Sequence, residues 1–150
     1  MDGIKLAETV LRKLESSRLA AEGIRVQIEQ LDADMVHETE IGYISAGGTD
    51  PAARMKVLLD RKRVLEKREK ALRSHVRHVD RVLAAMDERE RDTIKRFYCS
   101  GLRPGEALLR LEWEMNISRS EVYRIRERGL WAFACRMGYM EHDPEKGNER

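Results

Sequence analysis

The chain has 150 residues, of which 37% are charged and only 5% are aromatic. Long stretches rich in Ala, Glu, Lys, Leu and Arg are typical of long helices or a coiled coil, and they argue against a compact enzyme. No apolar run reaches the roughly 18 residues of a membrane span, and the N-terminus lacks the apolar segment of a secretory signal. We therefore expect a soluble, cytoplasmic protein without a membrane partner.

The net charge of +2 is small, but its distribution along the chain is uneven. Residues 1–50 carry five basic and ten acidic side chains, whereas residues 51–86 carry eleven basic and four acidic ones. Residues 118–137 are basic again, with five Arg and two Glu. This segregation indicates an acidic and a basic element that can lie side by side, followed by a basic C-terminal segment.

Residues 4–35 are expected to form one long helix. Apolar residues recur every seven positions, with a second set three residues after the first, which gives a coiled-coil seam of about four heptads. Gly23 weakens this helix by roughly 1 kcal/mol relative to Ala without ending it. The residues of the seam are Ala7, Val10, Leu14, Ser17, Ala21, Ile24, Ile28, Leu31 and Met35.

A glycine-rich loop is expected over residues 38–48, after which Thr49 or Asp50 caps a second helix with Pro51 in its first turn. The second helix continues the heptad pattern, interrupted by Lys62 and Glu69. Two helices of similar length should form an antiparallel hairpin about 45–50 Å long. Because such a hairpin buries little surface by itself, we expect its seam to pair with a second copy in a homodimer. The seam residues of the second helix are Met55, Leu58, Leu65, Leu72, Val76, Val79, Leu83 and Met86.

Two other features of the hairpin allow more than one interpretation. The basic run from Arg61 to Arg77 is either a contact to the DNA backbone or a solvated helix face paired with the acidic helix, and we favour the second reading. His75 and His78 could share a helix face, but no further ligand stands at metal-binding spacing beside them. We expect no metal site and no cofactor.

Three shorter helices are expected after residue 86. Asp87 and Glu90 have the spacing of a capping box, in which each side chain bonds the other residue's backbone N–H, and Gly101 ends the helix they begin. Pro104 starts the next helix, and only Asn116 and Ile117 separate that helix from the last one. Inward positions of the first of these helices are Ile94, Phe97 and Tyr98.

The last helix begins with a second capping box, Ser118 and Glu121, and Gly138 stops it. Its inward stripe is formed by Val122, Ile125, Leu130, Phe133 and Met137. Its opposite face carries Arg119, Ser120, Tyr123, Arg124 and Glu127. Two helices joined by so short a turn, the second with an exposed polar start, are what a helix-turn-helix needs to place side chains in the major groove.

This pattern resembles region 4 of sigma-70-type factors, a four-helix fold that reads promoters. Here the pattern follows a long charged helical region, and this combination resembles more closely the ArpU and RinA families of phage-encoded regulators of late-gene transcription. The resemblance covers about the last third of the chain and implies a sequence-specific transcriptional regulator in a bacterial host, which could also contact RNA polymerase. It departs from sigma factors at the bulky Leu111-Glu112-Trp113 and at Tyr123. The residues that carry it are Leu83, Asp87-Glu88-Arg89-Glu90-Arg91, Ile94, Phe97-Tyr98, Gly101, Leu111, Met115, Ile117-Ser118-Arg119, Val122, Ile125 and Leu130, together with Tyr123-Arg124-Ile125-Arg126 and Leu130-Trp131-Ala132-Phe133-Ala134.

The exposed face of the last helix supplies the candidate base-reading residues. Arg119 and Arg124 suit bidentate hydrogen bonds to guanine, Ser120 a short hydrogen bond, and Tyr123 packing against a thymine methyl group or a phosphate. Glu127 lies on the same face. The candidate phosphate contacts, which would set register without specifying sequence, are Arg103, Arg110, Arg126 and Arg128.

The sequence thus predicts an all-α protein with three parts: an oligomerising helical hairpin over 1–86, a helix-turn-helix DNA-binding domain over 87–139 and a disordered tail over 140–150. We find no catalytic constellation, because no nucleophile has an adjacent base and no phosphate-binding glycine loop is present. Two alternatives to a regulator that binds double-stranded DNA remain. One is a DNA-packaging protein like a small terminase subunit, and the other is a coiled-coil adaptor that binds RNA polymerase.

Overall fold

The computed structural model describes residues 2–42 and 50–141, and these are built from α-helices without a strand. The predicted all-α class is therefore confirmed. The contacts divide the chain into two compact units. One unit comprises residues 16–76, and the other combines the residues up to Glu15 with those from Arg77 onward. The helices are α1 (Gly3–Gly42), α2 (Pro51–Ala85), α3 (Glu88–Tyr98), α4 (Pro104–Met115) and α5 (Arg119–Arg136).

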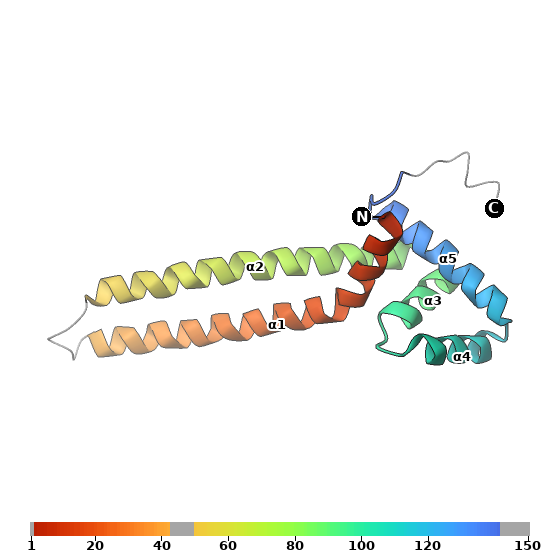
Figure 1. Cartoon of the computed structure of the whole chain (residues 1–150). Helices are drawn as coiled ribbons and strands as arrows, with labels where there is room; N and C mark the ends of the chain where they lie inside the picture. The colour runs from red at the N-terminus through yellow and green to blue at the C-terminus, as the bar shows by residue number, and fades with distance from the viewer. Residues whose placement is uncertain (1, 43–49, 142–150) are drawn as a thin grey trace. The chain divides into compact units, whose positions relative to one another are not determined.

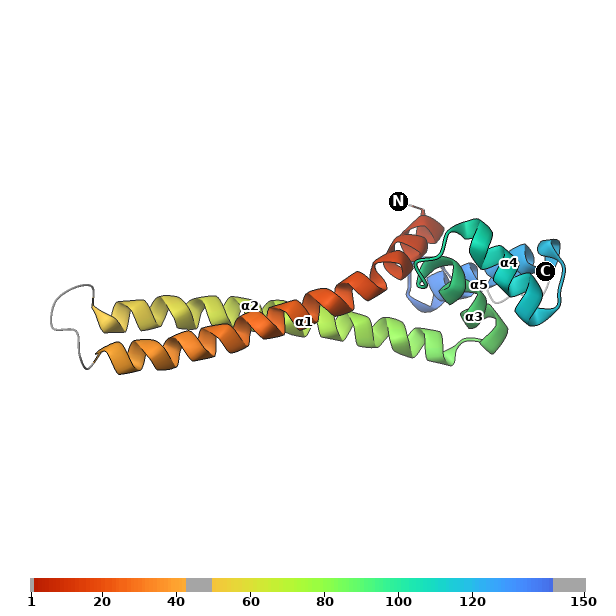
Figure 2. The ribbon, with the colours of Figure 1, turned by 90° about the horizontal axis from the view of Figure 1, so that it is seen from below.

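In the unit over residues 16–76, α1 and α2 run antiparallel and side by side (Figure 1; Figure 2). Two ion pairs fix their register: Lys62 Nζ lies 2.6 Å from Asp32 Oδ1, and Arg54 Nε lies 3.0 Å from Glu38 Oε2. The hydrogen bond to Asp32 raises the pKa of Lys62. Lys62 therefore occupies its seam position as a cation bonded to the opposite helix.

The predicted seam forms within this hairpin. On α1 its apolar positions are buried from Ala21 to Leu31, and on α2 the facing positions are half-buried from Met55 to Leu72 and buried at Val76. Since each helix uses its seam against the other, a second copy would have to bind elsewhere on the hairpin. The buried side chains of α1 within this unit are Ala21, Ile24, Ile28 and Leu31, and the half-buried ones of α2 are Met55, Leu58, Leu65 and Leu72.

The first helix is longer than the sequence indicated. It continues to Gly42, so the predicted loop over 38–48 was wrong about its first residues. The Thr39 hydroxyl donates to the carbonyl oxygen of Met35 at 2.9 Å, and Glu38 is held by Arg54 of α2. These two contacts stabilise an extra turn whose polar composition had indicated a loop. The remainder of the predicted loop, residues 43–49, lies outside the described residues.

The start of α2 agrees with the prediction. The Asp50 side chain accepts a hydrogen bond from the Ala52 N–H at 3.1 Å, and the Asp50 carbonyl oxygen accepts from Ala53 and Arg54. Pro51 is the first helical residue, where a missing N–H removes no bond.

The second unit includes more of the chain than the predicted 87–139 domain. The Cys99 thiol lies 3.5 Å from the Leu11 carbonyl oxygen, and the Arg12 guanidinium lies 5.3 Å from the centre of the Tyr98 ring. The first turns of α1 and the last turns of α2 thus belong with α3, α4 and α5, and not with the hairpin. Only contacts between residues far apart in the sequence reveal this division. The predicted tail over 140–150 lies outside the described residues apart from Met140 and Glu141.

Helices α3 and α5 pack at very close range. A Cβ atom at Gly129 would stand 2.8 Å from Cγ2 of the buried Ile94 and 3.0 Å from the Glu90 carbonyl oxygen. The glycine therefore permits an approach that no other residue would allow. Gly129 therefore determines how closely α5 packs against α3.

The helices in the described part of the chain include none that is both long and apolar enough to cross a membrane.

Candidate nucleic-acid interface

A two-residue link positions α5 against α4. Asn116 adopts a left-handed conformation with φ of 53°, which asparagine tolerates better than most residues, and Ile117 follows it. The Ile117 N–H donates to the Glu112 carbonyl oxygen at 3.3 Å. The chain thus reverses within one turn and starts α5 at Arg119.

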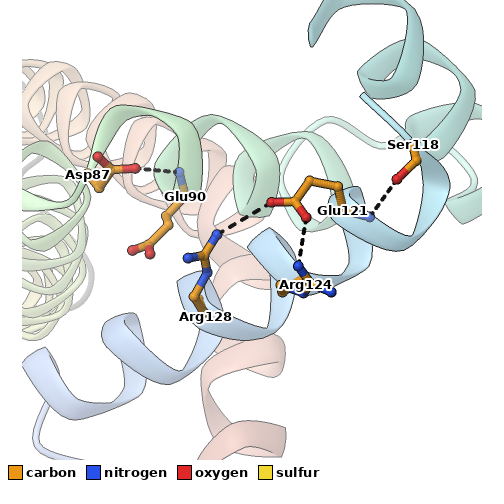
Figure 3. A network of polar contacts seen from close by, with 6 residues as sticks. All are labelled: Asp87, Glu90, Ser118, Glu121, Arg124 and Arg128. Atoms are coloured by element: carbon orange, nitrogen blue, oxygen red, sulfur yellow. Dashed lines mark hydrogen bonds and ion pairs between the residues drawn. The ribbon is translucent and has the colours of Figure 1, made fainter. Parts of the chain in front are cut away.

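Both predicted capping boxes are only half formed. The Ser118 hydroxyl accepts from the Glu121 N–H at 3.3 Å, and the Asp87 carboxylate accepts from the Glu90 N–H at 3.3 Å (Figure 3). The two Glu side chains, however, do not point back toward their caps (Figure 3). Burial, with a smaller contribution from Asp87, raises the pKa of Glu90, which lies half-buried. The Glu121 carboxylate turns instead toward the arginines of α5.

The inward stripe of α5 is as predicted. Val122, Ile125 and Phe133 are fully buried, Leu130 is nearly so, and Met137 is half-buried. A core beneath the start of α5 includes Val122 together with residues of α3 and α4. Its members are Phe97, Ala107, Leu108, Leu111 and Val122, with Tyr98, Leu102, Met115 and Ile117 packed around them.

The opposite face of α5 is exposed, also as predicted. All the candidate base-reading residues lie there: Arg119, Ser120, Tyr123, Arg124 and Glu127. Tyr123 is 38% exposed. Of the candidate phosphate contacts, Arg103, Arg110 and Arg128 are also exposed.

Arg126 differs from the other arginines of this region. It is half-buried, and its guanidinium lies 5.0 Å from the centre of the Phe97 ring and 4.8 Å from the centre of the Tyr123 ring. Cations stack favourably on aromatic faces in this way. Arg126 therefore links the Tyr123 ring to the core, and its charged group is engaged by these two rings.

Carboxylates occupy three of the remaining arginines. Arg124 Nη1 lies 3.1 Å from Glu121 Oε2, and Arg128 Nη2 lies 3.9 Å from the other oxygen of the same carboxylate (Figure 3). Across the turn, Arg119 Nε lies 3.6 Å from Glu112 Oε1. The cationic face is thus partly neutralised within the protein itself.

The sequence reading missed these partners for different reasons. The spacing of three from Glu121 to Arg124 is a recognisable helix pair, but the capping-box assignment took precedence. The contact of Glu112 with Arg119 crosses the turn between helices, and no sequence spacing indicates it.

Helix α4 presents two exposed apolar side chains whose exposure the sequence analysis did not predict. Trp113 is 87% exposed and Leu109 is 60% exposed. They are four residues apart and so lie on one side of α4, away from the buried Ala107, Leu108 and Leu111.

The start of α5 exposes a cationic, hydrogen-bonding surface. Long cationic side chains project from the first turns of a helix whose N-terminus carries a partial positive charge. The chain matches no protein-family model, and comparisons with curated proteins and with solved structures return no match.

Proposed function

We propose that the chain is a sequence-specific DNA-binding transcriptional regulator, in which α4 and α5 form a helix-turn-helix and α5 is the recognition helix. The observation that carries the proposal is the open face at the start of α5, where Arg119, Tyr123 and Arg124 remain exposed above a buried stripe. A recognition helix needs both a buried side and an exposed side, because the buried side holds the helix on the protein while the exposed side enters the groove.

In this proposal the N-terminal half of α5 enters the major groove. Arg119 and Arg124 would exchange their carboxylate partners for the N7 and O6 acceptors of guanine. Ser120 and Glu127 lie on the same exposed face of α5. The Glu127 carboxylate can accept a hydrogen bond from the amino group of cytosine. Tyr123, held by Arg126, presents its ring to a thymine methyl group or a phosphate.

The exposed arginines around this face supply the contacts that do not depend on sequence. Arg103 precedes the first helical residue of α4, and Arg110 lies further along the same helix. Arg128 follows on α5. Contacts from such residues to phosphates fix the register of the protein on the duplex and give binding its salt dependence.

The wider assignment follows from the same proposal. The resemblance to the ArpU and RinA families favours a phage or prophage regulator of late genes acting in the bacterial cytoplasm. A homodimer formed through α1 and α2 would present two recognition helices to a two-fold or repeated site. In the same proposal, RNA polymerase is a further partner of the C-terminal helices.

Selection of bound duplexes from a random DNA pool tests the proposal. We expect enrichment of a defined sequence. The logarithm of the binding constant should fall linearly with the logarithm of the salt concentration. Enrichment of no sequence, together with an absence of salt-dependent binding to any duplex, would reject a DNA reader. Specific binding to RNA polymerase without DNA binding would favour the adaptor instead.

A further inference from the structure

Gly23 stands in the middle of α1, where a glycine costs about 1 kcal/mol relative to alanine. Nothing in the hairpin requires it: a Cβ atom built at Gly23 meets no heavy atom within 4 Å, and the residue is exposed. This contrasts with Gly129, whose neighbours leave no room for a side chain. A glycine that its own hairpin does not need is useful where another surface approaches the backbone closely.

The surface around Gly23 is a shallow groove between α1 and α2. Small side chains, Ala20 from α1 and Ala71 from α2, line it, with Gln27 and Arg68 at its sides. The low walls make a hollow that a neighbouring helix can enter. We call this side of residues 16–76 the Gly23 face.

Exposed valines continue the Gly23 face along α2. Val64 and Val57 precede Ala71 by seven and fourteen residues, so they lie on the same side of the helix. They are 64% and 57% exposed. Two valines and an alanine in a regular row at solvent-facing positions are unexpected on a helix that is otherwise densely charged.

The charges that border this face are complementary between two copies of the chain. Arg61 precedes Arg68 by seven residues and Asp34 follows Gln27 by seven, so both flank the groove, one on each helix. The pairs Asp32 with Lys62 and Glu38 with Arg54 set the register of the hairpin. By that register, Arg61 and Asp34 stand at nearly the same height.

We propose, resting on the homodimer in the proposed function, that a second copy of the chain packs on the Gly23 face with the two hairpins parallel. A two-fold axis along the helices then puts α2 of each copy over α1 of the other at matching height. Arg61 faces Asp34 of the second copy, Arg68 faces Gln27, and Ala71 faces Gly23. The interface is isologous, so each contact occurs twice.

Charge decides against the other two-fold arrangement. An axis across the helices would place α2 over α2 and set the row of Arg61 and Arg68 against itself, which like charges disfavour. The parallel pair also sends both chains toward α3 from the same end of the paired hairpins. Two recognition helices connected in this way can serve adjacent half-sites.

Measuring the mass of the full chain without DNA, by sedimentation equilibrium across micromolar concentrations, tests the proposal. We expect about twice the 17.5 kDa of the monomer. Val64→Lys should raise the dimer dissociation constant at least about tenfold. Val36→Lys is the matched control, because Val36 is 60% exposed and lies about 140° around α1 from Gly23 at 100° per residue. It should leave the constant unchanged.

Two further variants separate a lost interface from a lost fold. Gly23→Leu improves helix propensity, and a Cβ atom at this position meets no heavy atom within 4 Å, so helix content should be kept while dimerisation weakens. Arg61→Glu and Asp34→Arg should each weaken the dimer, and the double variant should restore it.

Three outcomes would overturn the proposal: a monomeric wild-type chain, equal effects of the Val64 and Val36 variants, or tighter association of Arg61→Glu alone. Since no DNA is present, these outcomes leave the proposed DNA binding untouched. Conversely, a dimer that binds no duplex would reject the DNA reader and retain this interface.

Discussion

The Glu121 carboxylate lies 3.1 Å from the Arg124 guanidinium, on the exposed side of α5. Its second oxygen is 3.9 Å from Arg128, so one carboxylate restrains two of the arginines that the proposed function uses (Figure 3). Exposed ion pairs of this kind are each worth about 0.2–1 kcal/mol. A duplex must replace these ion pairs before it can bind the arginines. A duplex of non-matching sequence forms fewer hydrogen bonds with the arginines and so compensates less for the lost ion pairs.

Glu121→Gln should therefore strengthen binding to DNA of unrelated sequence. We expect the affinity for a mixed-sequence duplex to rise about three- to tenfold, because two arginines lose an anionic competitor. The preference for the selected sequence over the mixed one should fall accordingly. Fluorescence anisotropy with both duplexes over a range of salt concentrations measures the two effects.

Glu127→Gln is the control for that change. It removes the same charge from the same helix, but no ion pair joins Glu127 to an arginine within the described residues. A smaller, purely electrostatic gain is expected. Equal gains for both variants would show that the contact of Glu121 with its arginines has no special effect.

Arg126 and Arg128 should behave differently, although the sequence analysis assigned both to phosphate contacts. Arg128→Gln removes an exposed cation and should lower the slope of log affinity against log salt by about one. Arg126→Gln should leave that slope nearly unchanged and lower the stability by about 0.5–2 kcal/mol, because it removes a cation from two aromatic rings. Salt titration and urea unfolding of both variants provide the comparison. A drop in slope for Arg126→Gln as large as that for Arg128→Gln would return Arg126 to the phosphate contacts.

The sequence predicted the features that depend on local periodicity and missed those that depend on contacts between distant segments. The seven-residue spacing located the buried positions of α1 from Ala21 to Leu31 but missed the fully buried Leu11. The spacing of Val122, Ile125 and Phe133 separated the inward from the outward face of α5. Such patterns suffice because a helix repeats its environment every turn.

Three features needed the structure. The extension of α1 to Gly42 depends on an ion pair with α2, and the grouping of Leu11 with α3 depends on a contact 88 residues along the chain. The position of Arg126 depends on Phe97 of another helix. In each case tertiary contacts override the local pattern.

Gly129→Ala should destabilise the unit formed by α3, α4 and α5. The added methyl group would stand 2.8 Å from Ile94, which is fully buried and has little freedom to move. Overpacking of this kind costs about 1–3 kcal/mol, part of which the better helix propensity of alanine offsets. Urea unfolding at fixed protein concentration should give a lower midpoint.

Gly105→Ala provides the comparison for Gly129. A Cβ atom at Gly105 has no neighbour within 4 Å, and the residue lies in the first turn of α4. The free energy of unfolding of the Gly105→Ala variant should stay the same or rise by up to about 1 kcal/mol. If Gly129→Ala were as stable as Gly105→Ala, the result would contradict the close packing of α5 against α3.

The stability of the same unit should depend on pH through Glu90. Burial raises the pKa of this carboxyl in the folded protein, so the folded state holds its proton more tightly than the unfolded state. Its contribution to the free energy of unfolding is most favourable below its ordinary pKa and falls as pH rises to the raised value. Glu90→Gln should therefore be more stable than the wild type at pH 7 and equal to it in acid. Thermal melts at several pH values test this, with the exposed Glu88→Gln as the control that should show no such difference.

Arg124 provides the most direct test of base reading. Arg124→Ala should cost about 1–3 kcal/mol of discrimination between the selected duplex and one altered at the base pair that Arg124 contacts. Helix content by circular dichroism should not change, because the Arg124 side chain is exposed and its ion-pair partner Glu121 lies on the same helix. Arg136→Ala removes another exposed arginine from the last turn of the same helix and should keep the full discrimination. If Arg124→Ala weakened binding to both duplexes by the same factor, as the loss of a phosphate contact would, Arg124 would not read a base, and the reading face would have to be sought among Arg119, Ser120 and Tyr123.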